Sequence, residues 1–160
     1  MKNIVISMQN TLLSEAIVRA FSDTGEFRIE QILPGKTNDT LSLCCAMQAE
    51  ILLMEVSRLP AYSLESRLKL IECVRRAMPN CKFVLLCDEN SDPELAHRVM
   101  IVRQDRLIDA FLYASVTPAY LTAALERSDR HEKTMEAHFR RTACRADAVP
   151  VSMLRRSRAT

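Results

Sequence analysis

Two uninterrupted apolar runs constrain the fold of this chain more than any other feature. They are ILLMEV at residues 51–56 and KFVLLC at residues 82–87. Both are short, as strands are, and a strand that is apolar on both faces is typical of a parallel sheet covered by helices on each side. Between them, apolar residues recur at helical spacing from residue 64 to residue 78. This segment therefore predicts a strand–helix–strand unit with a parallel connection.

The same alternation continues along the chain. Further strands are predicted at residues 4–6, 27–33 and 108–113, and further helices at residues 11–21, 39–48, 93–104 and from 117 through at least 124. Gly25 suits the position after a helix, and Pro93 and Pro118 suit first helical turns. Because such crossovers are right-handed, five alternating units predict a doubly wound α/β sheet with five parallel strands in the order 2-1-3-4-5.

Composition limits the class of protein further. The 160 residues are 48% hydrophobic, which suits one globular domain. No apolar run approaches the ~20 residues of a membrane span, and the N-terminal segment lacks the apolar stretch of a signal peptide. The six cysteines form no CxxC pair, so we expect buried free thiols in a cytoplasmic protein.

Charge divides the chain into two parts. The net charge is +2, but residues 138–160 alone carry six arginines and one aspartate, and the rest of the chain is mildly acidic. We predict a folded domain over residues 1–127 and a helix extension with a flexible basic tail over 128–160. The tail is either solvated or contacts phosphate, and its candidate residues are Arg140, Arg141, Arg155 and Arg156.

Two segments carry a family resemblance. AEILLMEVS (49–57) is similar to the strand that bears the phospho-acceptor of bacterial response-regulator receiver domains. IDAFLYASVTPAYLTAAL (108–125) is similar to the last strand, loop and helix of those domains. In order and spacing, residues 2–127 thus resemble a receiver domain, especially the receivers joined to LuxR-type DNA-binding domains. The resemblance implies a flavodoxin-like fold and a role in two-component signal transduction or transcription regulation.

The resemblance also shows where the chain departs from its family. Active receivers use an acidic pair for Mg²⁺, an Asp as nucleophile, a hydroxyl and a Lys to bind the phosphoryl group. These positions fall on Met8, Gln9, Glu55, Cys87 and Ala114. A thioether cannot replace a carboxylate as a magnesium ligand, and residues 107–132 contain no Lys. The implied pocket is degenerate, without metal, cofactor or enzymatic activity.

Several roles remain open for the acidic residues of this pocket. Glu55 is a carboxylate bonded to loop amides or solvent, a built-in phosphate mimic, or a true acceptor. In the absence of a nearby cation it is instead a neutral, pH-sensitive plug bonded to Gln9 or Asn10. We expect Asp88 and Glu89 to accept backbone N–H groups of the loop that enters the next helix, rather than to bind a metal.

A candidate interaction surface lies near the fourth helix and fifth strand. The run VMIV at 99–102 interrupts an amphipathic pattern, so Met100 and Ile101 are expected to point outward unless the whole run is core. Tyr113 and Tyr120 flank the same region. In receivers this is a common signalling and dimer surface, so the resemblance implies a protein partner or a homodimer.

Three functions follow from these observations. The first is a pseudo-receiver that acts through protein contacts without Mg²⁺-dependent phosphorylation. The second is a DNA-associated regulator, whose dimer uses the basic tail or a helix-turn-helix output domain that the segment after residue 127 is too short to supply. The third is a flavodoxin-like binder of a small ligand, which is disfavoured because only two glycines are present and none lies in the first loop.

Overall fold

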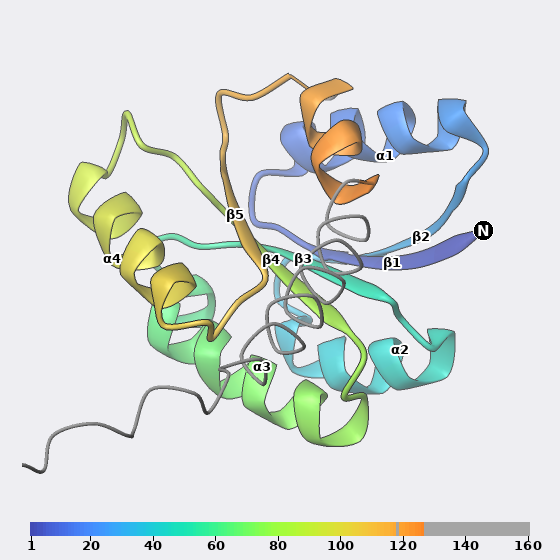
Figure 1. Cartoon of the computed structure of the whole chain (residues 1–160), viewed down its shortest axis with the longest axis horizontal. Coiled ribbons are helices and arrows are strands. Elements are labelled where there is room, and N and C mark those ends of the chain that lie inside the picture. The colour runs from blue at the N-terminus through green and yellow to red at the C-terminus, as the bar shows by residue number, and fades with distance from the viewer. Residues whose placement is uncertain (118, 127–160) are drawn as a thin grey trace, which may run out of the picture. The chain divides into compact units, whose positions relative to one another are not determined.

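The computed structural model describes residues 1–117 and 119–126. Its five strands form one parallel sheet in the order β2-β1-β3-β4-β5 (Figure 1). The strands are β1 (Lys2–Ser7), β2 (Phe27–Ile32), β3 (Ile51–Glu55), β4 (Lys82–Cys87) and β5 (Ala110–Tyr113). The predicted doubly wound α/β sheet and its strand order are confirmed. All five strands lie in one compact unit, Met1–Ala124.

A helix follows the carboxyl end of each strand. The helices are α1 (Thr11–Thr24), α2 (Thr40–Met47), α3 (Leu64–Ala77), α4 (Pro93–Gln104) and a helical segment over residues 119–126. Side chains cap the first turns of α1, α3 and α4: Asn10 accepts from the Leu13 N–H, Ser63 from Ser66 and Asp92 from Leu95. These caps satisfy amide groups that a helix leaves unpaired at its start.

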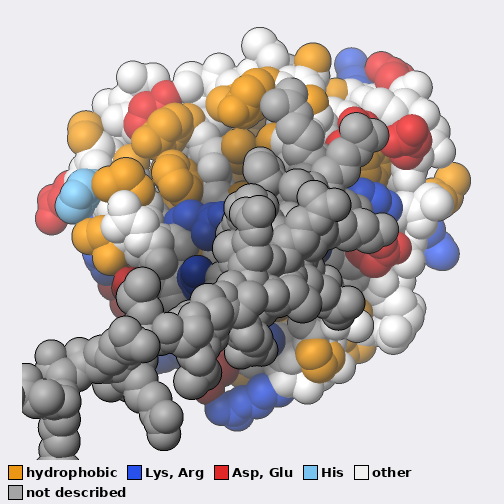
Figure 2. Space-filling model, in the orientation of Figure 1, with side chains coloured by type: hydrophobic (Ala, Val, Ile, Leu, Met, Phe, Trp, Pro, Cys, Tyr) orange, Lys and Arg blue, Asp and Glu red, His pale blue; other side chains and the backbone are white. Residues whose placement is uncertain are grey.

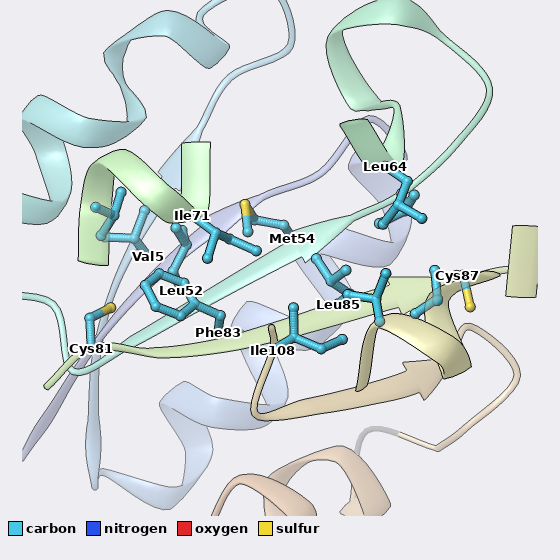
Figure 3. Packing of buried hydrophobic residues seen from close by; sticks show 14 of the residues in the cluster. Val5, Leu52, Met54, Leu64, Ile71, Cys81, Phe83, Leu85, Cys87 and Ile108 are labelled. Atoms are coloured by element: carbon cyan, nitrogen blue, oxygen red, sulfur yellow. The ribbon is translucent and has the colours of Figure 1, made fainter. Parts of the chain in front are cut away.

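Helices pack on both faces of the sheet. On one face, apolar side chains of β3 and β4 meet those of α3 (Figure 3), and the same cluster includes residues of α2 and α4. Leu52, Phe83 and Leu85 from the strands lie against Ile71 and its neighbours on α3. On the other face α1 buries Ile17 and Phe21, and the Phe21 ring lies 5.0 Å from that of Phe27. The apolar runs are buried because both faces are covered.

The fifth strand begins later than the sequence predicts. It starts at Ala110 rather than Ile108, although Ile108 is buried. Asp109 explains the difference, because its carboxylate accepts the Phe83 N–H at 2.7 Å and its own N–H donates to the Phe83 carbonyl. A side chain thus replaces a backbone partner at the point where the strand would otherwise begin.

The prediction of buried thiols is wrong for two of the cysteines. Cys44, Cys81 and Cys87 are buried, but Cys45 is half-buried and Cys73 is exposed. Cys73 lies on the outer face of α3, next to the buried Val74, so its position follows from helical geometry. All five are free thiols.

Two other predictions concern membrane-spanning helices and the segment after residue 127. No helix within residues 1–117 and 119–126 is long and apolar enough to cross a membrane. The predicted boundary after residue 127, the tail and its arginines 140, 141, 155 and 156 lie outside the part of the chain that the structure describes.

Candidate functional site

The Glu55 side chain connects two strands at the carboxyl edge of the sheet. Its Oε2 accepts the N–H of Gln9 at 2.7 Å and that of Asn10 at 2.9 Å. Asn10 is the N-cap of α1, so the carboxylate lies at the amino end of that helix. The partial positive charge of this helix end favours an anion there. Of the roles left open for Glu55, the structure shows the bonds to loop amides.

The two residues at the positions of the magnesium-binding pair differ in burial. Met8 is buried among apolar residues. Gln9 is exposed at the edge, and its side-chain Oε1 accepts a long hydrogen bond of 3.4 Å from the Ser57 hydroxyl. The structure therefore brings Gln9 and Glu55 together and leaves Met8 in the core.

Sequence reasoning missed a buried cation next to Glu55, which is Arg67 of α3. Its side chain is 1% exposed, and it lies beneath the ends of β1 and β3. The Nε–H donates to the Glu55 carbonyl at 2.9 Å. One Nη group donates to the Ser7 hydroxyl at 3.0 Å and the other to the Ser7 carbonyl at 2.9 Å. The guanidinium also lies 4.8 Å from the centre of the Tyr62 ring.

These contacts compensate the burial of a charge. Burial lowers the pKa of Arg67 to about 10, while nearby Tyr62 and Glu55 favour the charged form. The guanidinium therefore stays protonated at ordinary pH. The neutral-plug hypothesis for Glu55 assumed that no cation is near, and Arg67 removes that premise. A sequence signal existed: Arg67 stands on the apolar stripe formed by Leu64, Ile71 and Val74.

The ends of β4 and β5 form the other half of the edge. Cys87 pairs with Tyr113, and the Ala114 N–H donates to the Cys87 carbonyl at 2.8 Å. The Cys87 thiol is buried, and burial, followed by the charges of Glu89 and Asp88, raises its pKa to about 11. It is therefore a protonated and unreactive thiol at neutral pH.

The two acidic residues after β4 have separate roles. Asp88 accepts the N–H groups of Asn90 and Ser91 at 3.1 and 3.3 Å, as predicted, and the Ser91 hydroxyl at 2.5 Å. These hydrogen bonds hold the pKa of Asp88 below its usual value. For Glu89 the prediction is wrong. One oxygen accepts from the Ser115 hydroxyl in the loop after β5, and the other is buried without a hydrogen-bond partner.

Ion pairs join the loop after β3 and the first turn of α3 to α4. Arg58 makes a two-pronged contact with the N-cap Asp92, with its second bond at 2.9 Å, and Arg98 pairs with Glu65. The Arg58 contact holds the pKa of Asp92 at about 2. Between these elements lies a polar hollow of about 310 Å³. These ion pairs link the β3–α3 loop and the start of α3 to α4.

A second, more apolar hollow of about 480 Å³ lies beside β5. It is lined by Phe111, Leu112, Tyr113, Ser115, Val116, Thr117 and Tyr120. Tyr113 is 36% exposed, Tyr120 is 55% exposed, and the Tyr113 ring stands edge-on to that of Phe111 at 5.6 Å. The structure therefore brings the two predicted tyrosines into one surface feature.

The two apolar residues of α4 lie outside that hollow. Ile101 is 42% exposed and Met100 is half-buried, whereas Val99 and Val102 are buried against the sheet. The VMIV run is thus divided between core and surface. Hydrophobic side chains are visible at the surface between α4 and the loop after β5 (Figure 2).

The residues at the Glu55 edge are a poor donor set for Mg²⁺. This ion prefers several hard oxygen ligands in octahedral geometry. Here the edge offers the Glu55 carboxylate, already bonded to two amides, and the Gln9 amide oxygen. Within residues 1–117 and 119–126, no group of three or more His, Cys, Asp or Glu side chains could hold a metal ion.

No protein-family model and no curated protein matches the sequence. Solved structures do match. A CheY-like receiver domain protein from Methanospirillum hungatei is 18% identical with a TM-score of 0.61, over 84% of this chain and 98% of the other. A LuxR-family DNA-binding response regulator from Staphylococcus aureus is 15% identical with a TM-score of 0.62, over 80% and 98%.

A third match is a CheY-like protein, TadZ, from Pseudomonas aeruginosa. It is 16% identical with a TM-score of 0.62, and the match covers 80% of this chain and 99% of the other. The chain has the fold of a response-regulator receiver domain. In this receiver fold, Glu55, Cys87 and Ala114 lie at the carboxyl ends of β3, β4 and β5, where the sequence resemblance placed them.

Proposed function

We propose that this protein is a pseudo-receiver, a signal-transduction module that acts through protein contacts without Mg²⁺-dependent aspartyl phosphorylation. The observation that carries the proposal is that the Glu55 carboxylate is already hydrogen-bonded within the fold. Its carboxylate accepts the Gln9 and Asn10 amides, so the side chain at the acceptor position holds the first loop in place. A nucleophile that is also a structural acceptor would have to break these bonds to react.

The surrounding residues support the same proposal. Phosphoryl transfer depends on charge neutralisation at the transferred group. Met8 is buried, Ala114 has no ammonium group, and the thiol of Cys87 is buried below the edge. The pair of carboxylates, the hydroxyl and the Lys of an active receiver thus have no chemical equivalent at these positions.

The surface near β5 is the proposed site of protein contact. Tyr113 and Tyr120 line the apolar hollow, and Ile101 is exposed on the neighbouring α4. Aromatic side chains of this kind are enriched in protein interfaces, where they bury a large area at low entropic cost. We propose that a protein partner or a second copy of the chain covers this surface. A role in DNA binding through the basic tail would rest on residues outside those described.

The proposal is tested by NMR titration of the full chain with MgCl₂ to 10 mM and then with beryllofluoride. Unchanged amide signals of Gln9, Glu55, Cys87 and Ala114 are expected, because Mg²⁺ lacks its oxygen ligands. A matched variant, Gln9→Asp with Glu55→Asp, adds a carboxylate at position 9 and shortens the one at position 55, and it should show Mg²⁺-dependent shifts. Saturable shifts centred on Glu55 in the natural chain would contradict the proposal.

The contact surface has its own test. Tyr120→Ala should weaken self-association, or capture of a partner, at least tenfold, since interface tyrosines are common hot spots. His97→Ala, an exposed change on α4, is the control and should leave binding within about twofold. Equal binding by the Tyr120→Ala variant and the natural chain would exclude this surface.

A further inference from the structure

The buried guanidinium of Arg67 is the feature of the interior that the proposed function leaves unexplained. A charge with 1% exposure is costly to bury, and proteins bury one only where its donors are matched. Here the donors of Arg67 reach three oxygens on two different strands. Arg67 thus occupies a position that joins those two strands.

That position lies between the ends of β1 and β3. Ser7 is the last residue of β1 and Glu55 the last of β3, and the pairing of these two strands ends at Ser7 opposite Met54, one residue before Glu55. The Glu55 carbonyl lies past this pairing and needs a donor. Arg67 supplies one donor to this carbonyl and another to the Ser7 carbonyl, and it comes from α3, a third element.

Arg67 also affects how Glu55, the residue at the acceptor position, is held. The main chain of Glu55 is held by the Arg67 Nε–H, and its carboxylate is held by the Gln9 and Asn10 amides. Arg67 therefore fixes the backbone from which the carboxylate extends toward the first loop. The positive charge of the guanidinium also attracts the Glu55 carboxylate.

We propose that Arg67 is the resident cation of this site: its guanidinium joins the ends of β1 and β3 and positions Glu55 against the β1–α1 loop without a metal ion. This inference rests on the proposed function, since it names what does the joining when Mg²⁺ does not. Arg67 acts as a positioning residue through Glu55. It predicts that the loop holds one arrangement whether or not Mg²⁺ is present.

The first test uses the natural chain. The Nε–H of Arg67 should give an NMR signal that exchanges with water at least tenfold more slowly than those of exposed Arg76, because it is buried and bonded to a carbonyl. Addition of 10 mM MgCl₂ should leave this signal unchanged. Exchange as fast as that of Arg76 would overturn the proposal even if no variant folds.

The second test is chemical rescue. Arg67→Ala should lower Tm by at least about 5 °C and change the Gln9 and Asn10 amide signals, while Arg76→Ala should do neither. Methylguanidinium at 20 mM should raise the Tm of the Arg67→Ala variant and restore the two amide signals, whereas urea, of similar shape but uncharged, should not. Equal effects of the two additives would show that the site needs volume rather than a cation.

The two proposals fail in distinguishable ways. Mg²⁺-dependent shifts of Glu55 in the natural chain would contradict the pseudo-receiver function. Unchanged Gln9 and Asn10 signals in the folded Arg67→Ala variant would contradict the role of Arg67 and leave the pseudo-receiver proposal standing. The Tm of Arg67→Lys should lie between those of Arg67→Ala and the natural chain. The ammonium group keeps the charge but lacks the planar fork that reaches two strands.

Discussion

The two halves of the carboxyl edge are built differently. At the ends of β1 and β3, a buried guanidinium and a carboxylate hold the Ser7 and Glu55 main chains and the first loop, and no buried side-chain oxygen or nitrogen of the described residues there lacks a hydrogen-bond partner. At the ends of β4 and β5, the Glu89 carboxylate bonds Ser115 through one oxygen and leaves the other buried without a partner. Among the described residues, the β4–β5 half therefore contains a buried side-chain oxygen without a hydrogen-bond partner, and the β1–β3 half does not.

This difference leads us to expect that the two halves differ in how readily they change conformation. An unpaired buried oxygen costs free energy, so a rearrangement that supplies it with a donor is favoured. The β4–β5 half also carries the exposed tyrosines of the apolar hollow. We expect conformational change on partner binding in this half, while the β1–β3 half stays fixed. Each prediction below tests one side of the comparison, beginning with the largest expected effect.

Arg67→Met should destabilise the protein by about 2–4 kcal/mol, since it leaves buried oxygens of Ser7 and Glu55 without donors. Urea unfolding of the natural chain and the variant measures the change. Arg76→Met, on the same helix but exposed, is the matched control. A loss below about 0.5 kcal/mol in the Arg67→Met variant would mean that the β1–β3 half is not held by this residue.

Glu55→Ala should cost about 1–2 kcal/mol, because two amides at the start of α1 lose a charged acceptor. Glu55→Gln keeps one acceptor oxygen and should cost less. Amide exchange of Gln9 and Asn10 reports the loss directly and should accelerate in the Glu55→Ala variant. If exchange at both amides stays unchanged, the carboxylate does not secure the loop.

Asp92 joins the two halves through Arg58, and acid should release it. Its folded pKa of about 2 lies below the ordinary 3.8, so its contribution to stability is fully present above about pH 4 and is lost as pH falls toward 2. Asp92→Asn keeps the helix cap but removes the charge. Unfolding free energies between pH 5 and pH 2 should show a shallower acid dependence in this variant. Identical slopes would assign that dependence to other carboxylates.

Ser115→Ala should have the smallest effect on stability, about 0.5–1 kcal/mol or less, because the Ser115 hydroxyl is exposed. Its effect on dynamics should be larger. Ring signals of Tyr113 and Tyr120 should shift or broaden, since the bond between Ser115 and Glu89 links the loops after β4 and β5. Thr117→Ala, a change at the helix cap in the same loop, gives the comparison. Unchanged tyrosine signals in Ser115→Ala would argue against a responsive β4–β5 half.

Element order and burial were predictable from local patterns. The runs at 51–56 and 82–87 became β3 and β4, and Pro93 begins α4 as expected. Such features depend on side-chain periodicity and on caps within one turn, which a sequence displays directly. The placement of Glu55, Cys87 and Ala114 at strand ends follows from the same patterns, with the family resemblance fixing the register.

The sequence did not determine the contacts between loops that are far apart along the chain. The Glu55 carboxylate finds amides about 46 residues away, and Arg67 finds Ser7 at a separation of 60. Glu89 turns from its own loop to Ser115. Because hydrogen bonds require partners within about 3 Å and in line, they depend on how the sheet places its loops, which no local pattern records. Sequence thus determined which residues reach the edge, and tertiary structure decided which of them bind each other.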